Sequence, residues 1–312
     1  MCQPICTPDL LLLLAAIALA AFGGEAFLKG VLGVASHLRL PKLLVATTLA
    51  AFATSSPELT VSTIAALSGK PEIGLGDALG SNVVNMGLIL GLVLLFGQLS
   101  VRYGEIRRDF LLALGIPVLT LFLARDGILS GSEGGLLLAL FAIWLGLTAK
   151  QAYFHRKQNS VDTQSMINPA RAWIFLLTGL AALILAGRLF VVGASGIASA
   201  LGVHPYLIGA IIIAIGTSLP ELVTTLLARL RGHDDVSLGT LLGSNLFNGL
   251  AIVGTAASIH PIRAPTAEVA VALGFGTLSV ALVLPYRGRL SQQRGVLLLI
   301  VYSAFLGTSV AI

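Results

Sequence analysis

Residues 51–91 read AFATSSPELTVSTIAALSGKPEIGLGDALGSNVVNMGLILG, and residues 214–254 read AIGTSLPELVTTLLARLRGHDDVSLGTLLGSNLFNGLAIVG. The two stretches align without a gap at a shift of 163 residues, and 18 of the 41 aligned positions are identical. Each carries a Thr-Ser-x-Pro-Glu motif and, further on, a Gly-Ser-Asn-x-x-Asn motif. Polar residues that recur in register within apolar sequence indicate an internal duplication with a polar site inside a membrane.

The composition of the whole chain is that of a membrane protein. Of 312 residues, 56% are hydrophobic and 11% are charged, against about 45–50% and about 25% in soluble domains. The apolar runs are continuous rather than alternating, which favours helices over a β-barrel. A helix of about 20 apolar residues crosses the hydrocarbon core. We therefore expect an all-α polytopic membrane protein with ten transmembrane helices, at residues 9–36, 41–67, 74–98, 107–124, 131–154, 171–200, 205–230, 237–258, 266–285 and 293–311.

The ten expected helices divide into two halves. Residues 1–155 form the first five-helix repeat and residues 171–312 the second, and a polar cytoplasmic linker at residues 156–170 joins them. Because five is odd, the second half enters the membrane with the opposite polarity. Such inverted repeats are an architecture of secondary transporters, with the substrate site near the midplane.

Basic residues indicate the orientation of the chain. Loops on one side of the expected helices hold 14 Lys and Arg residues, and loops on the other side hold only Lys70, Arg125 and Arg263. The positive-inside rule places the basic side in the cytoplasm and both termini outside. Topology accounts for the excess of positive charge, so a nucleic-acid partner is not expected.

Glu58 and Glu221, the acids of the two motifs, lie within apolar segments, where an ionised carboxylate costs several kcal/mol. Two such groups facing one another require protons or cations to neutralise them. Carboxylate, hydroxyl and amide oxygens are hard ligands, which favours Ca²⁺ or Na⁺ over Zn²⁺ or Cu⁺. Alternatively, the hydroxyls join neighbouring helices by hydrogen bonds. The candidate side chains are those of Thr54, Ser55, Glu58, Ser81, Asn85, Thr217, Ser218, Glu221, Ser244 and Asn248.

Spacing places these side chains on shared helix faces. Thr54 and Glu58 are four residues apart, as are Ser81 and Asn85, so each pair points the same way from its helix. Asp77 lies four residues before Ser81, where it either lines an approach path or caps the outer end of the helix.

The two prolines of the motifs predict local breaks. Pro57 and Pro220 cannot donate to the carbonyls four residues earlier, at Ala53 and Gly216. Freed carbonyls and a kink are tolerated in a membrane where they face a polar cavity or ions.

The two blocks resemble the α-repeats of the cation/Ca²⁺ antiporter superfamily, especially the prokaryotic sodium/calcium exchangers. The likeness is strongest over residues 46–92 and 209–255. It implies a central Ca²⁺ site between Glu58 and Glu221, completed by Asn85 and Asn248. It further implies flanking Na⁺ sites built from Thr54, Ser55, Ser81, Thr217, Ser218 and Ser244, with the backbone carbonyls of Ala51 and Ala214.

The resemblance also implies a mechanism and a location. The first and sixth helices would slide as a gate, in a transporter of the prokaryotic inner membrane that is not an enzyme and uses no cofactor. The transported ions would be Ca²⁺ and Na⁺. No nucleophile–base pair or H-E-x-x-H motif points to an enzyme instead.

Two positions depart from the family pattern. Ala53 replaces the usual Gly before Thr-Ser, which predicts a slight change in the kink. Asn248 stands where some relatives carry Asp, which argues against coupling to K⁺. Na⁺ is the preferred coupling ion, a Ca²⁺/H⁺ or other cation/H⁺ antiporter is the alternative, and a cation channel is a third reading from another class.

Overall fold

The computed structural model describes residues 7–158, 168–201, 214–264, 266–285 and 288–311, and helices make up most of them. The helical elements of the first half are α1 (Thr7–Leu38), α2 (Lys42–Val45), η1 (Ala46–Ala50), α3 (Ala51–Thr54), α4 (Ser56–Leu67), α5 (Pro71–Val83), η2 (Val84–Ile89), α6 (Leu90–Leu95), α7 (Tyr103–Leu123), η3 (Ala124–Asp126) and α8 (Gly131–Gln158). Those of the second half are α9 (Pro169–Ala200), α11 (Ala214–Thr217), α12 (Leu219–Leu230), α13 (Asp234–Leu246), η5 (Phe247–Ile252), α14 (Val253–Ile259), α15 (Thr266–Leu282) and α16 (Gln292–Ala311).

Helices occur at each of the ten expected positions, although the start of the seventh lies outside the described residues. Five stretches are long and apolar enough to cross a membrane: Pro8–Leu38, Pro71–Leu95, Gly131–Lys157, Pro169–Ala198 and Asp234–Ile259. The count of ten crossings stays a prediction. The linker begins later than expected, because α8 continues through Arg156 and Lys157 to Gln158.

The predicted proline breaks occur in both halves. Ser55 separates α3 from α4 with φ −86° and ψ 8°, and Ser218 separates α11 from α12 with φ −85° and ψ 11°. Each proline occupies the second position of the following helix, where its missing N–H costs no internal hydrogen bond. The near-identical angles indicate that Ala53, expected to alter the first kink, leaves its geometry unchanged.

Among the described residues, three segments of π-helix widen the backbone near these breaks. The first, η1, directly precedes α3, and η2 and η5 continue α5 and α13. A π-helical turn inserts an extra residue per turn and is frequent at functional sites. Asn85 lies in η2 and Asn248 lies in η5.

The internal repeat of the sequence is a repeat of the fold. A shift of 163 residues carries the bounds of α3, α4, α5 and η2 onto those of α11, α12, α13 and η5. Equivalent sequences have therefore adopted the same succession of helix, break, helix and π-helical turn.

Two short strand pairs tie the halves together. The strands β1 (Leu99–Ser100) and β4 (Arg289–Leu290) pair antiparallel, as do β2 (Ile128–Leu129) and β3 (Ile262–Arg263). Beside them, Val101 N donates to Gly288 O and Ala264 N donates to Gly127 O, both at 2.9 Å. Each strand pair thus has one strand from the first half and one from the second. Exchanging the two halves converts one pair into the other.

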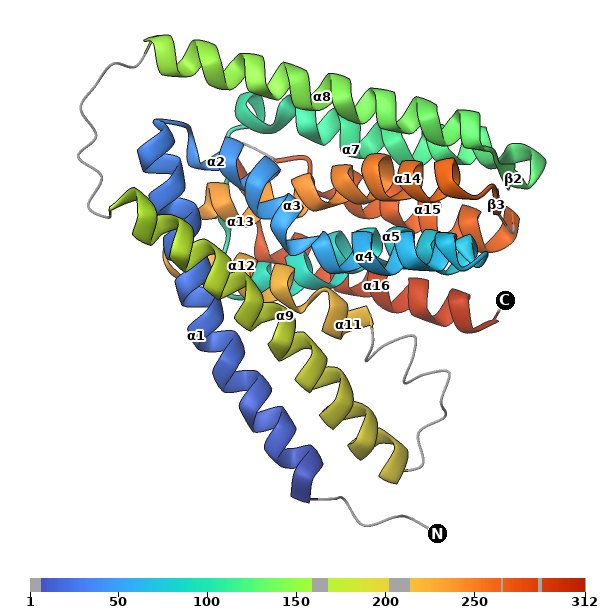
Figure 1. Ribbon diagram of the computed structural model, residues 1–312, viewed down its shortest axis with the longest axis horizontal. Helices are drawn as coiled ribbons and strands as arrows, with labels where there is room; N and C mark the ends of the chain where they lie inside the picture. Colours follow the sequence, from blue (N-terminus) through green and yellow to red (C-terminus); the bar gives the residue numbers. More distant parts are fainter. Residues whose placement is uncertain (1–6, 159–167, 202–213, 265, 286–287, 312) are drawn as a thin grey trace.

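α1 and α9 form a separate layer. Figure 1 shows them side by side and running obliquely past the remaining helices. Glycines allow the close approach, since a methyl group at Gly23 would collide with Ala182 and one at Gly179 with Phe27. This layer contacts the rest of the molecule chiefly through α12.

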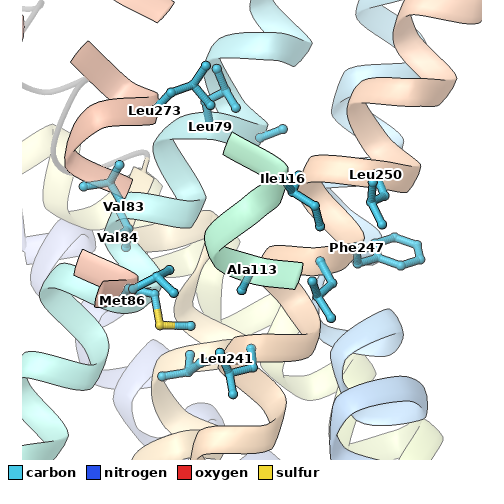
Figure 2. Close-up of a cluster of buried hydrophobic side chains, with 14 of the residues drawn as sticks. Leu79, Val83, Val84, Met86, Ala113, Ile116, Leu241, Phe247, Leu250 and Leu273 are labelled. Atoms are coloured by element: carbon cyan, nitrogen blue, oxygen red, sulfur yellow. The ribbon is translucent and has the colours of Figure 1, made fainter. Parts of the chain in front are cut away.

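The remaining helices share one apolar core. Leu79, Met86, Leu241 and Leu250 are at most 4% exposed and belong to its central cluster (Figure 2). These residues come from α5, η2, α13 and η5, the elements that follow the two broken helices. The repeat motifs are therefore anchored in the best-packed part of the molecule.

Candidate cation site

The two motif glutamates begin the two half-helices. Glu58 lies in the first turn of α4 and Glu221 in the first turn of α12, and each is 1% exposed. Unpaired N–H groups give a helix N-terminus a partial positive charge, which favours a nearby carboxylate. Ser55, in the break before the helix of Glu58, donates to Glu221, so the two motifs meet. That the two glutamates face one another across the repeats stays a prediction.

Hydroxyl groups from both halves surround Glu221. Ser55 Oγ donates to Glu221 Oε1 at 3.1 Å, and Ser244 Oγ donates to the same oxygen at 3.4 Å. Thr54 Oγ1 lies 3.4 Å from Ser244 Oγ. Ser55 and Thr54 come from the first half of the chain and Ser244 from the second, so one polar cluster spans both repeats.

Five of the buried polar atoms that have no hydrogen-bond partner among the described residues are oxygens of predicted ligand side chains. They are Glu58 Oε2, Glu221 Oε2, Asn85 Oδ1, Asn248 Oδ1 and Ser218 Oγ. All five side chains are 1% exposed. Buried polar atoms in folded proteins are mostly paired, and leaving one unpaired costs free energy. Oxygens gathered without donors are the environment that a hard cation completes.

The backbone carbonyl oxygens near the first break accept more hydrogen bonds than the proline chemistry led us to expect. The carbonyl of Ala53, expected to be freed by Pro57, accepts a hydrogen bond from Ser56 Oγ at 2.7 Å. The carbonyl of Ala51 accepts Ser55 N at 3.0 Å and Thr54 Oγ1 at 3.3 Å. A carbonyl oxygen has two lone pairs and can accept two hydrogen bonds. At Ala53, the hydroxyl of Ser56 replaces the N–H donor that Pro57 lacks.

The other predicted ligands occupy corresponding places. Ser81 is 5% exposed on α5, one turn before Asn85. Thr217 is half-buried at the end of α11 and its side chain has an interaction partner. Ala214 begins α11, and its side chain lies outside the described part of the chain. Printed contacts thus bring together Thr54, Ser55, Glu221 and Ser244, and the assignment of the remaining predicted ligands to the same site stays a prediction.

Asn82 and Asn245 are site-adjacent residues that the sequence analysis passed over. Asn82 Nδ2 donates to Asn245 O at 3.4 Å, and Asn245 Nδ2 donates to Asn82 O at 3.2 Å. Asn245 Oδ1 also accepts Asn85 Nδ2 at 3.2 Å. Their occurrence at the same place in both Gly-Ser-Asn motifs was the available signal, because a residue near a twofold axis lies close to its own equivalent.

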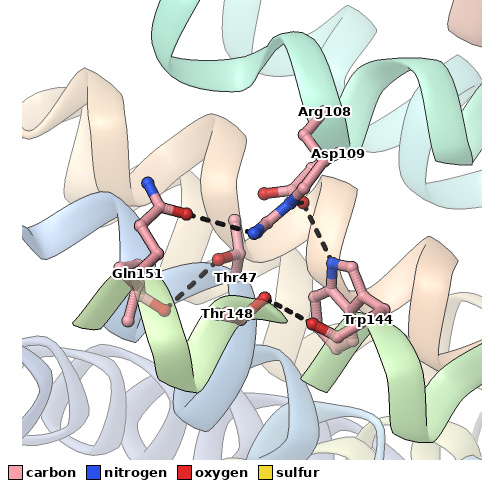
Figure 3. Close-up of polar contacts among 7 residues, drawn as sticks. Thr47, Arg108, Asp109, Trp144, Thr148 and Gln151 are labelled. Atoms are coloured by element: carbon pink, nitrogen blue, oxygen red, sulfur yellow. Dashed lines mark hydrogen bonds and ion pairs between the residues drawn. The ribbon is translucent and has the colours of Figure 1, made fainter. Parts of the chain in front are cut away.

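A second polar cluster lies on α7 and α8, apart from the glutamates. Asp109 is 4% exposed and accepts Arg108 Nε at 2.9 Å and Trp144 Nε1 at 3.0 Å. Arg108 also donates to Gln151 at 3.1 Å (Figure 3). A cavity of about 680 Å³ with Asp109 and Lys42 in its lining opens beside this network. No sequence motif pointed to it, because its partners are far apart in the chain.

Within the described residues, no group of three or more His, Cys, Asp or Glu side chains is arranged to hold a metal ion. A cation at the glutamates would therefore depend on hydroxyl, amide and carbonyl oxygens as well as carboxylates. Such ligand sets suit Ca²⁺ and Na⁺.

The fold is that of a membrane ion exchanger. It matches the solved structure of the sodium-calcium exchanger NCX_Mj soaked with zero Na⁺ and Ca²⁺, with a TM-score of 0.83 and 26% sequence identity, over 96% of this chain and 98% of that one. The sequence profile of the family described as "Sodium/calcium exchanger protein" matches residues 9–150 and 171–311. The chain belongs to this sodium/calcium exchanger family.

Similar proteins of known sequence extend over nearly the same length. "Putative antiporter CaxA" of Alkalimonas amylolytica is 34% identical over 306 residues, which cover 94% of this chain and 95% of that protein. "Sodium/calcium exchanger MaX1" of Methanosarcina acetivorans is 26% identical over 345 aligned positions, covering 96% and 98%. The chain is accordingly an integral, multi-pass membrane protein of a family that exchanges Ca²⁺ against another cation, and it is a transporter rather than an enzyme.

Proposed function

We propose that the protein is a secondary active antiporter that exchanges Na⁺ for Ca²⁺ at a midplane site between Glu58 and Glu221. The five unpartnered oxygens of the candidate site carry this proposal. Two carboxylate oxygens and two amide oxygens would bind Ca²⁺ directly, and water, hydroxyl and backbone oxygens complete the six to eight ligands that the ion needs. The two negative charges of the glutamates match one Ca²⁺.

Na⁺ would occupy positions flanking the centre. The proposed ligands are the hydroxyls of Thr54, Ser55, Ser81, Thr217, Ser218 and Ser244 and the carbonyls of Ala51 and Ala214. Ser55 and Ser244 now donate to Glu221 Oε1, so their oxygens are already at the carboxylate. Na⁺ and Ca²⁺ would not bind at the same time. Both kinds of ion together around two carboxylates would leave excess positive charge in a medium of low dielectric constant.

Alternating access would follow from two inverted repeats, residues 1–155 and 171–312, in a bundle of ten transmembrane helices. The repeated break and π-helical turn, and the reciprocal pairing of Asn82 with Asn245, are consistent with a twofold relation in the membrane plane. The layer of α1 and α9 is the proposed moving part. Its glycine-lined interface and its limited contact with the core suit a rigid pair that slides.

The proposed orientation keeps the basic loops in the cytoplasm and both termini in the periplasm, with the protein in a prokaryotic inner membrane. In the described structure, the loop before α2 and the loop between α12 and α13 lie together, since Lys42 Nζ is 3.4 Å from His233 Nδ1. Both loops belong to the basic side of the predicted topology, and their proximity is consistent with it.

Flux measurements separate Na⁺ coupling from the alternatives. Membrane vesicles containing the protein are loaded with Na⁺, K⁺ or acid in turn, and uptake of ⁴⁵Ca²⁺ is followed after dilution. We expect uptake to follow the Na⁺ gradient. Uptake that ignores Na⁺ and follows a pH gradient would establish the Ca²⁺/H⁺ alternative, and Ca²⁺ currents without countertransport would establish a channel.

Two substitutions test the site itself. Glu58→Gln and Glu221→Gln preserve shape but remove one charge each, so we expect both to abolish Ca²⁺ exchange. Glu105→Gln removes an exposed acid of α7 and serves as the matched control. Exchange by either site variant at the rate of the Glu105→Gln protein would disprove the site assignment.

A further inference from the structure

An apolar cavity of about 530 Å³ lies between the broken helix of the first half and α8. Residues of η1, α3 and α4 line one part of it, and residues of α8, η5 and α14 line the rest. Aromatic rings form much of the wall. The ring of Phe247 lies 5.2 Å from that of Phe52 and 5.4 Å from that of Phe141. Binding pockets are mostly apolar and measure about 300–1,000 Å³, so this cavity is large enough to hold a ligand.

The wall of this cavity reaches the outer surface of the helix bundle. Leu145 on α8 and Phe52 on α3 both line it, and they are 45% and 50% exposed. The α8 segment is apolar enough to cross a membrane, and most of it is not covered by other helices of the described structure. Lipid surrounds such a surface in a bilayer. The apolar ligand that this setting supplies is therefore an acyl chain.

The polar cavity of about 680 Å³ described above adjoins the apolar one. Thr47 lines both cavities. Trp144, in the wall of the apolar cavity, donates Nε1 to Asp109, in the wall of the polar cavity, at 3.0 Å. Figure 3 shows these three side chains grouped together. The two cavities thus form one site that is apolar at one end and polar at the other.

The depth of the site matches one leaflet of a bilayer. Lys42 and Asp235 line the polar cavity at the starts of α2 and α13, where helix ends meet the membrane surface. Phe52, in the apolar cavity, lies ten residues after Lys42 along a helical segment. Ten helical residues span about 15 Å, which is half of the hydrocarbon core of about 30 Å. A lipid with its headgroup at Lys42 would therefore place its acyl chain beside Phe52.

The polar cavity is lined by charges of both signs, on Lys42, Arg108, Glu105, Asp109 and Asp235. Arg108 and Asp109 pair with each other, and Glu105 pairs with a neighbouring arginine. Lys42 and Asp235 belong to no ion pair among the described residues. One cation and one acid are thus left for a ligand, and they complement a headgroup that carries both a phosphate and an ammonium group.

We propose that the two cavities together bind one phospholipid with a zwitterionic ethanolamine headgroup. Its acyl chain lies in the apolar cavity, its phosphate lies against Lys42, and its ammonium group donates to Asp235. A glycerol headgroup has no cation for Asp235, and a choline headgroup has no N–H to donate to a carboxylate. The bound chain would pack behind the broken helix that carries Ser55. The inference concerns lipid binding and does not depend on which ions the protein exchanges.

Native mass spectrometry of the full chain in detergent tests the preference for a headgroup. The protein is incubated with equal amounts of phosphatidylethanolamine, phosphatidylcholine and phosphatidylglycerol that carry identical acyl chains, and the fraction of protein with each lipid bound is measured. We expect phosphatidylethanolamine to be retained above the other two. Preferential retention of phosphatidylglycerol or phosphatidylcholine, or equal retention of all three, would overturn the assignment of the headgroup.

Variants of the polar cavity test its two charges. Lys42→Met should weaken retention of phosphatidylethanolamine roughly five-fold, because one basic residue near a lipid surface contributes about a factor of this size. Asp235→Asn should instead remove the preference for phosphatidylethanolamine over phosphatidylcholine. Lys70→Met removes an exposed lysine outside the site and is the matched control. Retention by Lys42→Met equal to that by Lys70→Met would contradict the proposed role of Lys42.

Variants of the apolar cavity test whether the acyl chain binds there. Thr255 is half-buried in its wall, so Thr255→Phe should fill the cavity and abolish retention of every lipid. Leu145→Trp should narrow the same cavity from the exposed helix α8, without a change in the core. Thr178→Phe adds the same bulk to an exposed position of α9 and is the control. If Leu145→Trp and any folded Thr255→Phe protein retain as much lipid as Thr178→Phe, the site is not the one proposed.

Discussion

Asn82 and Asn245 each donate a side-chain hydrogen bond to the other's backbone carbonyl, at 3.4 Å and 3.2 Å. The two residues are equivalent under the 163-residue repeat, so the contact joins the halves of the molecule symmetrically. Both are nearly buried, at 7% and 5% exposure. The pair lies one turn or less from Ser81 and Ser244, and it holds the two Gly-Ser-Asn motifs in register.

Replacing either asparagine of this pair by alanine should destabilise the protein. Each single substitution leaves a buried carbonyl without its donor, which costs about 1–3 kcal/mol. Asn245→Ala should cost more than Asn82→Ala, because Asn245 Oδ1 also accepts Asn85 Nδ2. Thermal unfolding in detergent, with both single variants and the double variant, measures this. A loss in either single variant no larger than that of the exposed control Glu105→Gln would contradict the pairing.

Ser55 and Ser218 are equivalent in sequence but differ in their contacts. Ser55 donates to Glu221, whereas Ser218 Oγ has no partner among the described residues. In ion-free buffer, Ser55→Ala should therefore lower stability by about 1–2 kcal/mol and Ser218→Ala should have little effect. Thermal unfolding in the presence of a chelator measures both changes.

Added Na⁺ should make Ser218→Ala costly as well, because Ser218 is a proposed Na⁺ ligand. Ligand binding stabilises the folded state by an amount that grows with the ratio of ligand concentration to Kd. Ser218→Ala should show a smaller rise in melting temperature with Na⁺ than the wild type does. Equal rises in the wild type and Ser218→Ala would remove Ser218 from the proposed Na⁺ ligands.

The buried carboxylate of Asp109 should matter for stability rather than for ion binding. Asp109→Ala leaves the indole N–H of Trp144 without an acceptor in a buried position, so we expect a loss of about 1–3 kcal/mol. Trp144→Phe in the Asp109→Ala background removes that orphaned donor and should recover part of the loss. Chemical or thermal unfolding measures both variants, and Glu105→Gln is the exposed control. A loss in Asp109→Ala no larger than in Glu105→Gln would contradict the assigned network.

His233 should make stability depend on pH on the loop side of α13. Burial, and secondarily the nearby charge of Lys42, hold the pKa of the His233 imidazole below its ordinary value. The unfolded chain then binds the proton more readily than the folded chain does. The contribution of neutral His233 to stability is therefore complete above the unfolded pKa, about 6.5, and is lost as the pH falls through the folded pKa.

Melting temperatures at about pH 7.5 and about pH 5 test this dependence. The wild type should lose more stability on acidification than His233→Asn, which has no imidazole to protonate. Lys42→Met should move the pKa of His233 partly back toward its ordinary value, because burial is the larger cause. Identical pH profiles for the wild type and His233→Asn would contradict the assignment.

Much of this architecture follows from local sequence. Continuous apolar runs led to the helix positions, because a helix satisfies its own backbone in a membrane. Pro57 and Pro220 predicted helix breaks, because proline fits only the first turn of a helix. Each break lies two residues before its proline. The repeated motifs led to Thr54, Ser55, Glu221 and Ser244, whose side chains the fold brings into contact. The family membership that the motifs suggested is confirmed.

Tertiary contacts decided what local sequence did not. The carbonyl of Ala53 was expected to be free, but the hydroxyl of Ser56 reaches it. The pairing of Asn82 with Asn245 and that of Asp109 with Trp144 join residues distant in the chain, and no periodicity reveals such contacts. Equivalent residues also differ between the halves, as Ser55 and Ser218 do, because packing around each repeat is not the same.

The sequence by itself determined that two acids would be buried in a duplicated, helix-breaking motif, since charge, proline chemistry and apolar context are local properties. Only the tertiary structure decided that Ser55 and Ser244, from opposite halves, meet at one oxygen of Glu221. The physical reason is that burial and pairing depend on which helices pack together, and that arrangement is set by the whole chain.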